Sequence, residues 1–295
     1  MKIVPIAADS LGTRSMATFV ETADCRICID PAVSLGPLRY GLPPHPAEYQ
    51  RMDEHWESIK KYAKKADVLI LTHYHYDHHD PNFPRMYDGK SVLIKHPAEN
   101  INRSQKGRAG FFLKQIEGMP EKLEYADGRE FSFGKTTIRF SDAVFHGTGS
   151  RLGYVVEVSI REGKECFVFT SDVEGPNTEE QTEFIIRENP DVVYLDGPLS
   201  YMLGYRYSHE SMALAVDNIL RILNETDVET LIIDHHFLRD LKWKERIAKV
   251  FETGKKVLTA AEFLGIGNEM LEARRRELFK ENPVHKSVPL RHVEE

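Results

Sequence analysis

The sequence predicts an α/β fold in which β-sheets are sandwiched between layers of helices. Two segments, VLILT at 68–72 and CFVFT at 166–170, are apolar on both faces, as strands are when both faces of a sheet are covered. From residue 178 onward, strand-like and helix-like segments alternate, which is typical of helices packed on a sheet. Residues 122–172 form a third kind of region, in which β-strand patterns follow one another with glycine turns between them.

The first 120 residues contain both strand and helix patterns. A loop is expected at 31–47 because this stretch holds five prolines and two glycines. Pro97 ends the strand before it. In chain order we expect strands at 2–7 and 25–30, the loop at 31–47, a helix at 48–67, strands at 68–72 and 91–96, and a lid or short helix within 100–120.

The rest of the chain begins with strands and then alternates. A last helix is expected after Thr259, because Thr259 and Glu262 have the spacing of a capping box. We find no linker-like segment, so we expect one domain over residues 1–280 and a polar tail at 281–295. The expected elements are strands at 129–133, 136–146, 153–160 and 165–172, a helix after 178, strands at 191–196, 230–234 and 255–259, and helices at 209–225 and 240–253.

The composition describes an ordinary globular protein. Of its 295 residues, 41% are hydrophobic and 29% charged, and no apolar run approaches the roughly 20 residues of a membrane span. The N-terminus lacks the features of a secretory signal, so we expect a cytoplasmic protein with three reduced cysteines and no membrane partner. The net charge of −7 argues against binding to long nucleic acid. The sequence leaves the oligomeric state open.

The segment THYHYDHH at 72–79 points to metal chemistry. His73, His75, Asp77 and His78 follow directly on an apolar strand, and a strand that delivers imidazoles and a carboxylate to one point gives a metal site its geometry. Neutral imidazole and carboxylate suit zinc, and also iron or manganese.

This segment resembles the H-x-H-x-D-H signature of the metallo-β-lactamase superfamily. Later motifs match the superfamily in order, each after a strand: Asp30 in CRICIDPA, His146 in DAVFHG, Asp172 in FVFTSD and His235 in LIIDHH. The resemblance extends over residues 25–240. It implies a four-layer αβ/βα sandwich of two mixed β-sheets flanked by helices.

The resemblance also implies a site for two divalent ions, most simply Zn²⁺, with Mn²⁺ or Fe²⁺ as alternatives. Asp172 would bridge the two ions, and Asp77 would be a catalytic residue as well as a ligand. The expected metal ligands are His73, His75 and His146 for one ion, and Asp77, His78 and His235 for the other.

Several neighbours of these residues have less certain roles. Asp30 is expected to orient a ligand histidine through a hydrogen bond, and Asp234 is a second candidate for that role. His235 aligns with the first histidine of the signature when LIIDHH is laid over LILTHY, but His236 is left open as the ligand. His79 has no counterpart in the superfamily pattern.

The resemblance favours hydrolysis. Redox members with two irons carry glutamate where this chain has His75. A metal-bound hydroxide would then be the nucleophile, because an ion lowers the pKa of its bound water from 15.7 to about 7. The expected substrate is a phosphodiester or a related small-molecule or nucleotide ester. A lactone or thioester hydrolase is the alternative, and a non-catalytic metal-binding protein is the third.

A proton donor is expected from the phosphodiesterase branch of the superfamily. Asp196 matches its strand-end acid and His209 its helix-opening histidine, although SHES at 208–211 departs from the G-H-S-T pattern. The alternative makes His209 an ordinary first residue of a helix capped by Ser208.

Substrate contacts are expected from cationic residues near these motifs. Tyr205 and Arg206 are candidates because they border His209. Arg103, Lys106 and Arg108 form either a phosphate-contacting loop or a solvated surface.

Overall fold

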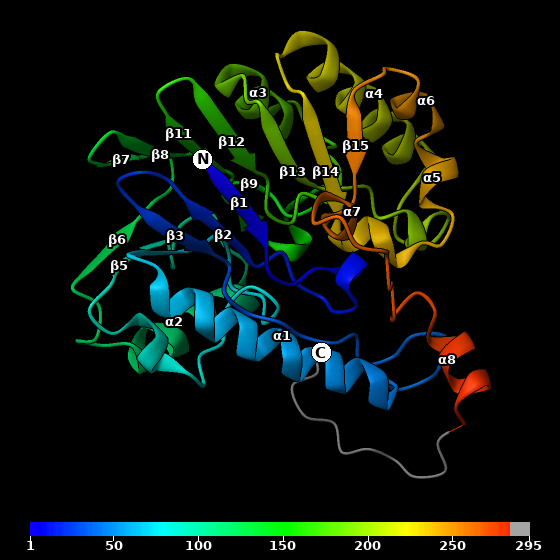
Figure 1. The fold of residues 1–295 in the computed structure, drawn as a ribbon, viewed down its shortest axis with the longest axis horizontal. Coiled ribbons are helices and arrows are strands. Elements are labelled where there is room, and N and C mark those ends of the chain that lie inside the picture. Colours follow the sequence, from blue (N-terminus) through cyan, green and yellow to red (C-terminus); the bar gives the residue numbers. More distant parts are fainter. Residues whose placement is uncertain (284–295) are drawn as a thin grey trace.

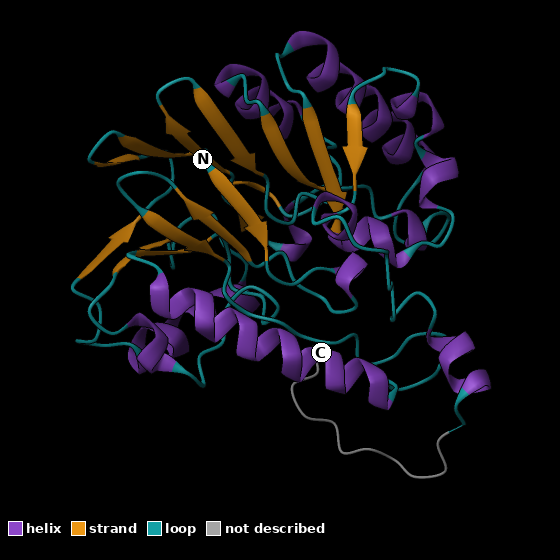
Figure 2. Cartoon of the chain, viewed as in Figure 1, coloured by secondary structure: helices purple, strands orange, loops and turns teal. Residues whose placement is uncertain are grey.

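The computed structural model describes residues 1–283. Two β-sheets face each other, and helices cover the outer face of each sheet (Figures 1 and 2). The predicted four-layer αβ/βα sandwich is therefore confirmed. Most of the tail predicted at 281–295 lies outside the described residues, and the assignment of residues 1–280 to one domain remains a prediction.

The first sheet contains six strands in the order in which they occur in the chain. The first three strands pair antiparallel and the later ones pair parallel. The strand at 18–21 was not predicted, because TFVE is too short to show an alternating pattern. The strands are β1 (Lys2–Pro5), β2 (Thr18–Glu21), β3 (Arg26–Ile29), β4 (Val68–Leu71), β5 (Ser91–Ile94) and β6 (Lys122–Tyr125).

The second sheet contains seven strands in the order β15-β14-β13-β12-β11-β8-β7. Its strands are β7 (Glu130–Phe133), β8 (Thr136–Phe140), β11 (Val158–Glu162), β12 (Glu165–Phe169), β13 (Val192–Asp196), β14 (Thr230–Asp234) and β15 (Lys256–Leu258). From β12 to β15 neighbouring strands are parallel, so their carboxyl ends meet at one edge. A separate antiparallel pair consists of β9 (Val144–Phe145) and β10 (Tyr154–Val155).

Three buried apolar clusters hold the layers together. The central one joins the inner faces of the two sheets, with Ile27 and Ile70 on one side and Ile160 and Phe167 on the other. The second packs the helices α1 and α2 on the first sheet, and the third packs α3 and α4 on the second. Burial on both faces explains why β4 and β12 are apolar without alternation.

The helices follow the prediction with three differences and one addition, a last helix at Arg275–Glu281 that was not predicted. The described helices are α1 (Pro46–Lys65), α2 (Arg103–Gln115), α3 (Glu179–Glu188), α4 (His209–Glu225), α5 (Trp243–Arg246), α6 (Ala248–Phe251), α7 (Ala260–Phe263) and α8 (Arg275–Glu281). Residues 103–115 form a helix capped by the Asn102 side chain. The helix predicted at 240–253 is two short helices that meet at Ile247.

The third difference lies at the start of α1, two residues before the predicted position. His45 and Glu48 form a capping box, and Pro46 occupies the first turn, where its missing N–H costs nothing. The capping box of Thr259 and Glu262 forms as predicted and opens the short α7. Within residues 1–283, none of the helices has the length and apolar character needed to cross a membrane.

Candidate metal centre

Strand ends converge between the two sheets. In the first sheet, β3 ends just before Asp30 and β4 just before the segment 72–79. In the second, Asp172 follows β12, Asp196 ends β13 and His235 follows β14. Parallel pairing of β3 with β4, of β12 with β13 and of β13 with β14 brings these ends to common edges.

The backbone turns sharply where it leaves these strands. Asp30, Ser171, Glu174 and His235 have φ angles of 47°, 58°, 47° and 56°. Such left-handed conformations are uncommon for residues other than glycine, and they cluster at functional sites where the surrounding structure holds them. These turns direct the side chains that follow each strand into the space between the sheets.

One group of side chains consists of His73, His75, His146 and Asp172, whose ligand atoms lie within 4.8 Å of one another. His73 Nε2 is 3.4 Å from Asp172 Oδ2, and His146 Nε2 is 3.3 Å from the same oxygen. His146 Nε2 also lies 3.1 Å from His75 Nδ1. Among these four residues only His75 is not fully buried.

A second group consists of Asp77, His78, Asp172 and His235, again with ligand atoms within 4.8 Å. His78 Nε2 and His235 Nε2 lie 3.0 Å and 3.4 Å from Asp172 Oδ1. His235 Nε2 is 3.5 Å from Asp77 Oδ2. One oxygen of Asp172 therefore faces each group, which is the arrangement required of a bridging carboxylate.

The residues present fit a pair of cations. His73 Nε2, His78 Nε2 and Asp172 Oδ1 are buried and, although they lie close to one another, none of them makes a hydrogen bond within residues 1–283. A buried polar atom left unpaired costs about 1–3 kcal/mol, so atoms of this kind gathered at one point call for a partner. Imidazole nitrogens and carboxylate oxygens are the donor set that Zn²⁺ takes in proteins.

Two histidines of the first group, His73 and His75, have the charge state of metal ligands, whereas at His146 the acids Asp172 and Glu174 outweigh burial and raise the pKa. Burial lowers the pKa of His73 to about 4 and that of His75 well below its ordinary value, so both rings are neutral. Neutral imidazole is the form that binds a metal.

In the second group, neighbouring carboxylates determine the pKa values of the histidines. Burial opposes the charged forms of His78 and His235, but Asp172 outweighs it together with Asp77 and Asp30 at His78 and with Asp9 at His235, and the pKa of both rings is raised well above the usual value. Burial opposes the ionised form of Asp172 as well, yet the imidazoles of His78 and His235 hold its pKa well below its usual range. The carboxylates of this group therefore require positive charge beside them, which bound cations would supply.

Two carboxylates orient histidines of the second group. Asp30 Oδ2 accepts a hydrogen bond from His78 Nδ1 at 2.8 Å, and the Thr72 amide and hydroxyl donate to the same carboxylate. Asp9 Oδ2 accepts from His235 Nδ1 at 2.9 Å, while its other oxygen accepts from Arg239 Nε at 2.9 Å. Each bond leaves Nε2 of its histidine facing Asp172, as carboxylate–histidine–metal arrangements require.

Asp9 was not among the residues predicted from the sequence. It begins the 3₁₀ helix η1 (Asp9–Leu11), a few residues after β1. Asp234, which was proposed for this role, accepts instead from the backbone amides of Ser10, His235 and Ala260 at 2.7–2.9 Å. It therefore fixes the backbone of the turn after β14 rather than the imidazole of a ligand.

Asp9→Asn is expected to weaken zinc binding about 10- to 100-fold, because outer hydrogen bonds to a ligand histidine typically contribute that much to metal affinity. Competition with a chelating dye measures the affinity. The matched control is Asp53→Asn, the same change at an exposed position of α1. Equal zinc affinity in the two variants would contradict a role for Asp9 in holding His235.

His235 rather than His236 belongs to the second group. The His235 side chain is 0% exposed and points to Asp77 and Asp172, whereas the His236 side chain is 10% exposed and points to Asp196 and Glu174. His236 also forms a separate group with Asp172 and Asp196, whose possible ligand atoms lie within 4.8 Å of one another.

Known proteins resemble the chain over nearly its whole length. A search against models of protein families found no match. A UPF0282 protein of Korarchaeum cryptofilum is 57% identical over 292 residues, which is 97% of both chains. Another, from Metallosphaera sedula, is 48% identical over 98% of this chain and 96% of its own.

The chain belongs to the UPF0282 family.

Solved structures place this UPF0282 chain in the metallo-β-lactamase fold. The metallo-beta-lactamase fold protein YhfI from Bacillus subtilis superposes with a TM-score of 0.52 and 17% identity, covering 87% of this chain and 94% of its own. An isothiocyanate hydrolase from Delia radicum gut bacteria superposes with a TM-score of 0.54 and 18% identity, covering 84% of this chain and 94% of its own. Zn²⁺-bound PqqB from Methylobacterium extorquens superposes with a TM-score of 0.50 and 10% identity, covering 88% of this chain and 98% of its own. At these identities the likeness shows the fold.

In this UPF0282 chain Asp196 holds His236 and not His209, which corrects the predicted pair. Asp196 Oδ2 lies 3.0 Å from His236 Nδ1, and the Asp196 carboxylate also accepts from the His236 and Glu174 amides. His209 is the exposed first residue of α4, capped by Ser208, and no bond joins it to Asp196 within the described part of the chain.

Burial acts on both partners of the Asp196–His236 pair. It raises the pKa of Asp196 well above its usual value and lowers that of His236 well below. Both shifts disfavour an isolated charge, so the buried pair favours a neutral state with one shared proton.

Glu174 completes this corner of the site, and sequence analysis missed it. Glu174 Oε1 lies 3.8 Å from both His146 Nδ1 and His236 Nε2. Gly147 has a φ of +77°, and a Cβ there would approach Glu174 Oε2 to 2.4 Å, so only glycine lets the two segments come this close.

The remaining predicted residues are not members of the two metal-ligand groups. Tyr205 is 79% exposed, and the Arg206 guanidinium lies over its ring at 5.7 Å. His79 is buried and donates from Nδ1 to the His75 carbonyl at 2.9 Å, so it supports the ligand loop. Arg103, Lys106 and Arg108 lie on α2 rather than in a loop.

Proposed function

We propose that the protein is a metal-dependent hydrolase with a dinuclear centre, acting on a phosphodiester or a related small-molecule ester. The observation that carries this proposal is the Asp172 carboxylate, with one oxygen toward each of two histidine-containing groups. Two metal-ligand groups that share one carboxylate at the edges of two sheets are suited to hydrolysis, because a two-metal site orients both the attacking and the leaving oxygen.

His73, His75 and His146 would hold one ion, Asp77, His78 and His235 the other, and Asp172 both. When bound, the ions supply a water nucleophile that is ionised near neutral pH. Zn²⁺ is our first choice because histidine dominates the donor set. Zn²⁺-bound PqqB and an isothiocyanate hydrolase share the fold, which supports zinc and hydrolysis as chemistry that this scaffold can accommodate.

The chain's own residues supply the rest of the chemistry. Asp30 and Asp9 fix the orientation of His78 and His235. His236, held at Nδ1 by Asp196, leaves Nε2 at the partly exposed edge of the site beside Glu174. We assign His236 Nε2 as the group that donates a proton to the departing oxygen. Sequence analysis predicted this role for His209.

The acidic balance of the chain limits the substrate. A net charge of −7 leaves little attraction for a long polyanion, so we propose a small molecule or a nucleotide as substrate. We also propose that the protein acts in the cytoplasm, where three unpaired cysteines remain reduced.

Metal analysis combined with a substrate panel tests the proposal. The expected result is two zinc ions per chain and turnover of bis(p-nitrophenyl) phosphate that chelation abolishes. Turnover confined to lactones or thioesters would favour the alternative ester class. Two bound ions without turnover on any of these substrates would refute a hydrolase and favour a binding protein.

A further inference from the structure

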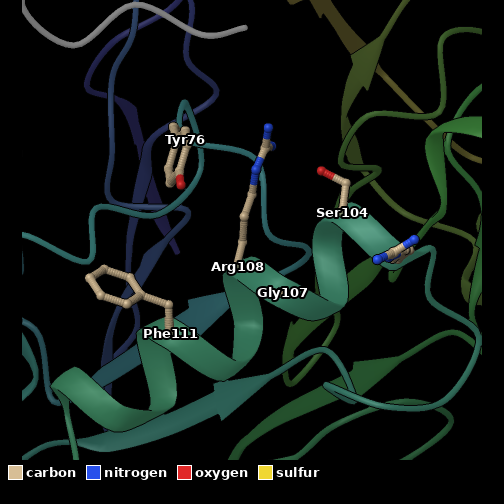
Figure 3. Close-up of a pocket in the computed structure, with 6 residues that line it drawn as sticks. Tyr76, Ser104, Gly107, Arg108 and Phe111 are labelled. Carbon is tan, nitrogen blue, oxygen red and sulfur yellow. The ribbon is translucent and has the colours of Figure 1, made fainter.

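A pocket of about 560 Å³ lies between α2 and the loop that follows β4. Figure 3 shows Arg108 extending from α2 toward the loop that carries Tyr76, with Phe111 and Ser104 on the same helix to either side. The lining residues are Tyr76, Arg103, Ser104, Gly107, Arg108 and Phe111.

The two arginines of the pocket lack a counter-charge. Within residues 1–283, neither the Arg103 nor the Arg108 guanidinium forms an ion pair with a carboxylate. Arg108 lies 4.6 Å over the Tyr76 ring, and the one hydrogen-bond acceptor it reaches in the described part of the chain is the Tyr74 carbonyl, at 3.5 Å. The chain has 46 acidic and 39 basic residues, so two guanidiniums without an acid beside one pocket indicate that a ligand provides the negative charge.

The pocket includes a residue of the loop that carries the metal ligands. Tyr76 stands in the chain between His75 and Asp77, and His75 is the ligand-group residue that is partly exposed. The start of α2 also contacts the loop after His146, because Asn102 Nδ2 and Gln105 Nε2 donate to the carbonyls of residues 151 and 152 at 3.1 Å and 2.9 Å. A molecule whose scissile bond lies at the metal groups can therefore extend over His75 into this pocket.

The lining chemistry identifies the kind of group that would enter. Guanidinium groups bind phosphate oxygens in a bidentate manner, and the Ser104 hydroxyl adds a further donor. Phe111 is 49% exposed, so its ring offers a flat apolar face, whereas the Tyr76 ring, 39% exposed, already stacks on His79 at 5.5 Å and carries the Arg108 guanidinium at 4.6 Å. An exposed aromatic ring beside cationic groups is suited to a planar base that carries phosphate.

We propose that this pocket binds a second phosphate group of the substrate, apart from the bond that is cleaved, and that the substrate is a nucleotide. The proposal rests on the proposed hydrolase function only in identifying the bound molecule as substrate. Arg103 and Arg108 bind the phosphate, Tyr76 holds the Arg108 guanidinium in place, and Phe111 stacks on the base. Neither arginine belongs to the metal-ligand groups, so their substitution is expected to change binding and not chemistry.

Calorimetry on the full-length zinc-loaded protein tests the pocket directly, with thymidine 5′-monophosphate and thymidine as probes. The wild type is expected to bind the monophosphate at least about tenfold more tightly than the nucleoside, because charge-assisted hydrogen bonds contribute that much. The double variant Arg103→Gln/Arg108→Gln should lose this difference. The single variant Arg103→Gln, at an exposed position, should lose part of it. The control Lys106→Gln removes a charge from the same helix outside the pocket lining and should keep the difference.

Kinetics separates this proposal from the proposed function. With the dinucleotides pTpT and TpT, the double variant should raise KM for pTpT about tenfold and leave kcat, and the KM for TpT, unchanged. Equal affinities for monophosphate and nucleoside, or a monophosphate affinity that the double variant retains, would overturn the pocket even if hydrolysis is found. Loss of monophosphate binding in the double variant without any turnover would support the pocket and refute the hydrolase.

Discussion

Asp172→Asn is expected to reduce the bound zinc from two ions to at most one per chain and to lower kcat/KM by at least about a thousandfold, which corresponds to ~4 kcal/mol. The amide keeps the shape of the carboxylate but removes its charge. Asp172 Oδ2 lies 3.3–3.4 Å from His73 and His146 Nε2, and Oδ1 lies 3.0–3.4 Å from His78 and His235 Nε2. Both metal-ligand groups therefore depend on this one side chain.

The readouts for Asp172→Asn are zinc content by elemental analysis, turnover of bis(p-nitrophenyl) phosphate and the melting temperature with and without chelator. Wild-type protein is expected to lose about 4 kcal/mol of stability on chelation if free zinc stands 1,000-fold above its dissociation constant. In the variant, chelation should lower the melting temperature less than it does in the wild type, because at most one ion remains to be removed. Asp53→Asn is the control for the loss of one carboxylate. Two retained ions with wild-type turnover would refute the bridging role.

The resemblance to the metallo-β-lactamase superfamily supplied the residues of the two metal-ligand groups, and a property of parallel sheets explains why these residues meet in space. A strand that is apolar on both faces can be recognised in the sequence. The polar residues that follow it lie at the carboxyl edge of the sheet. His73, Asp172 and His235 each follow such a strand, and the structure brings them together. His146 follows the short strand β9 and is brought to the same place.

Residues outside this pattern could not be found in the same way. Asp9 lies in a 3₁₀ turn several residues beyond β1, and only the packing of that turn against the segment 235–239 brings it to His235. The choice between His209 and His236 as the partner of Asp196 depends on the direction in which a side chain leaves the backbone. His235 has a φ of 56°, and this turn directs His235 to Asp172 and His236 to Asp196. The φ angle of His235 cannot be read from the pattern of residue types in the sequence.

The fold predicted from the resemblance is correct, while local structure was less certain where propensities were weak. Residues 100–120 contain three glycines, and their polar sequence left a lid and a helix equally open. In the structure the Asn102 cap and the buried side chains of Gln105, Ala109 and Phe112 stabilise α2 across two of those glycines. Tertiary burial here overrides the unfavourable intrinsic propensity of glycine, which costs up to about 1 kcal/mol per residue.

His236→Ala is expected to lower kcat about 10²- to 10⁴-fold for a phosphodiester with a poor leaving group, and to have little effect for one with a good leaving group. An alkoxide departing from TpT needs a proton, whereas the nitrophenolate of bis(p-nitrophenyl) phosphate departs without one. The geometric reason is the 3.0 Å contact of His236 Nδ1 with Asp196 Oδ2, which leaves Nε2 at the partly exposed edge of the site. Asp196→Asn should show the same dependence on the leaving group, because it removes the carboxylate that orients the ring.

The matched variant is His209→Ala, which should leave both reactions unchanged because His209 is exposed and makes no bond to Asp196 within the described residues. Elemental analysis decides between proton transfer and metal binding: His236→Ala should retain two zinc ions, whereas His235→Ala should not. A loss of zinc in His236→Ala would instead place His236 among the ligands, since its ring also lies close to Asp172 and Asp196. A selective loss of the poor-leaving-group reaction in His209→Ala would require α4 to move its first residue into the site, and would restore the pair that the sequence first suggested.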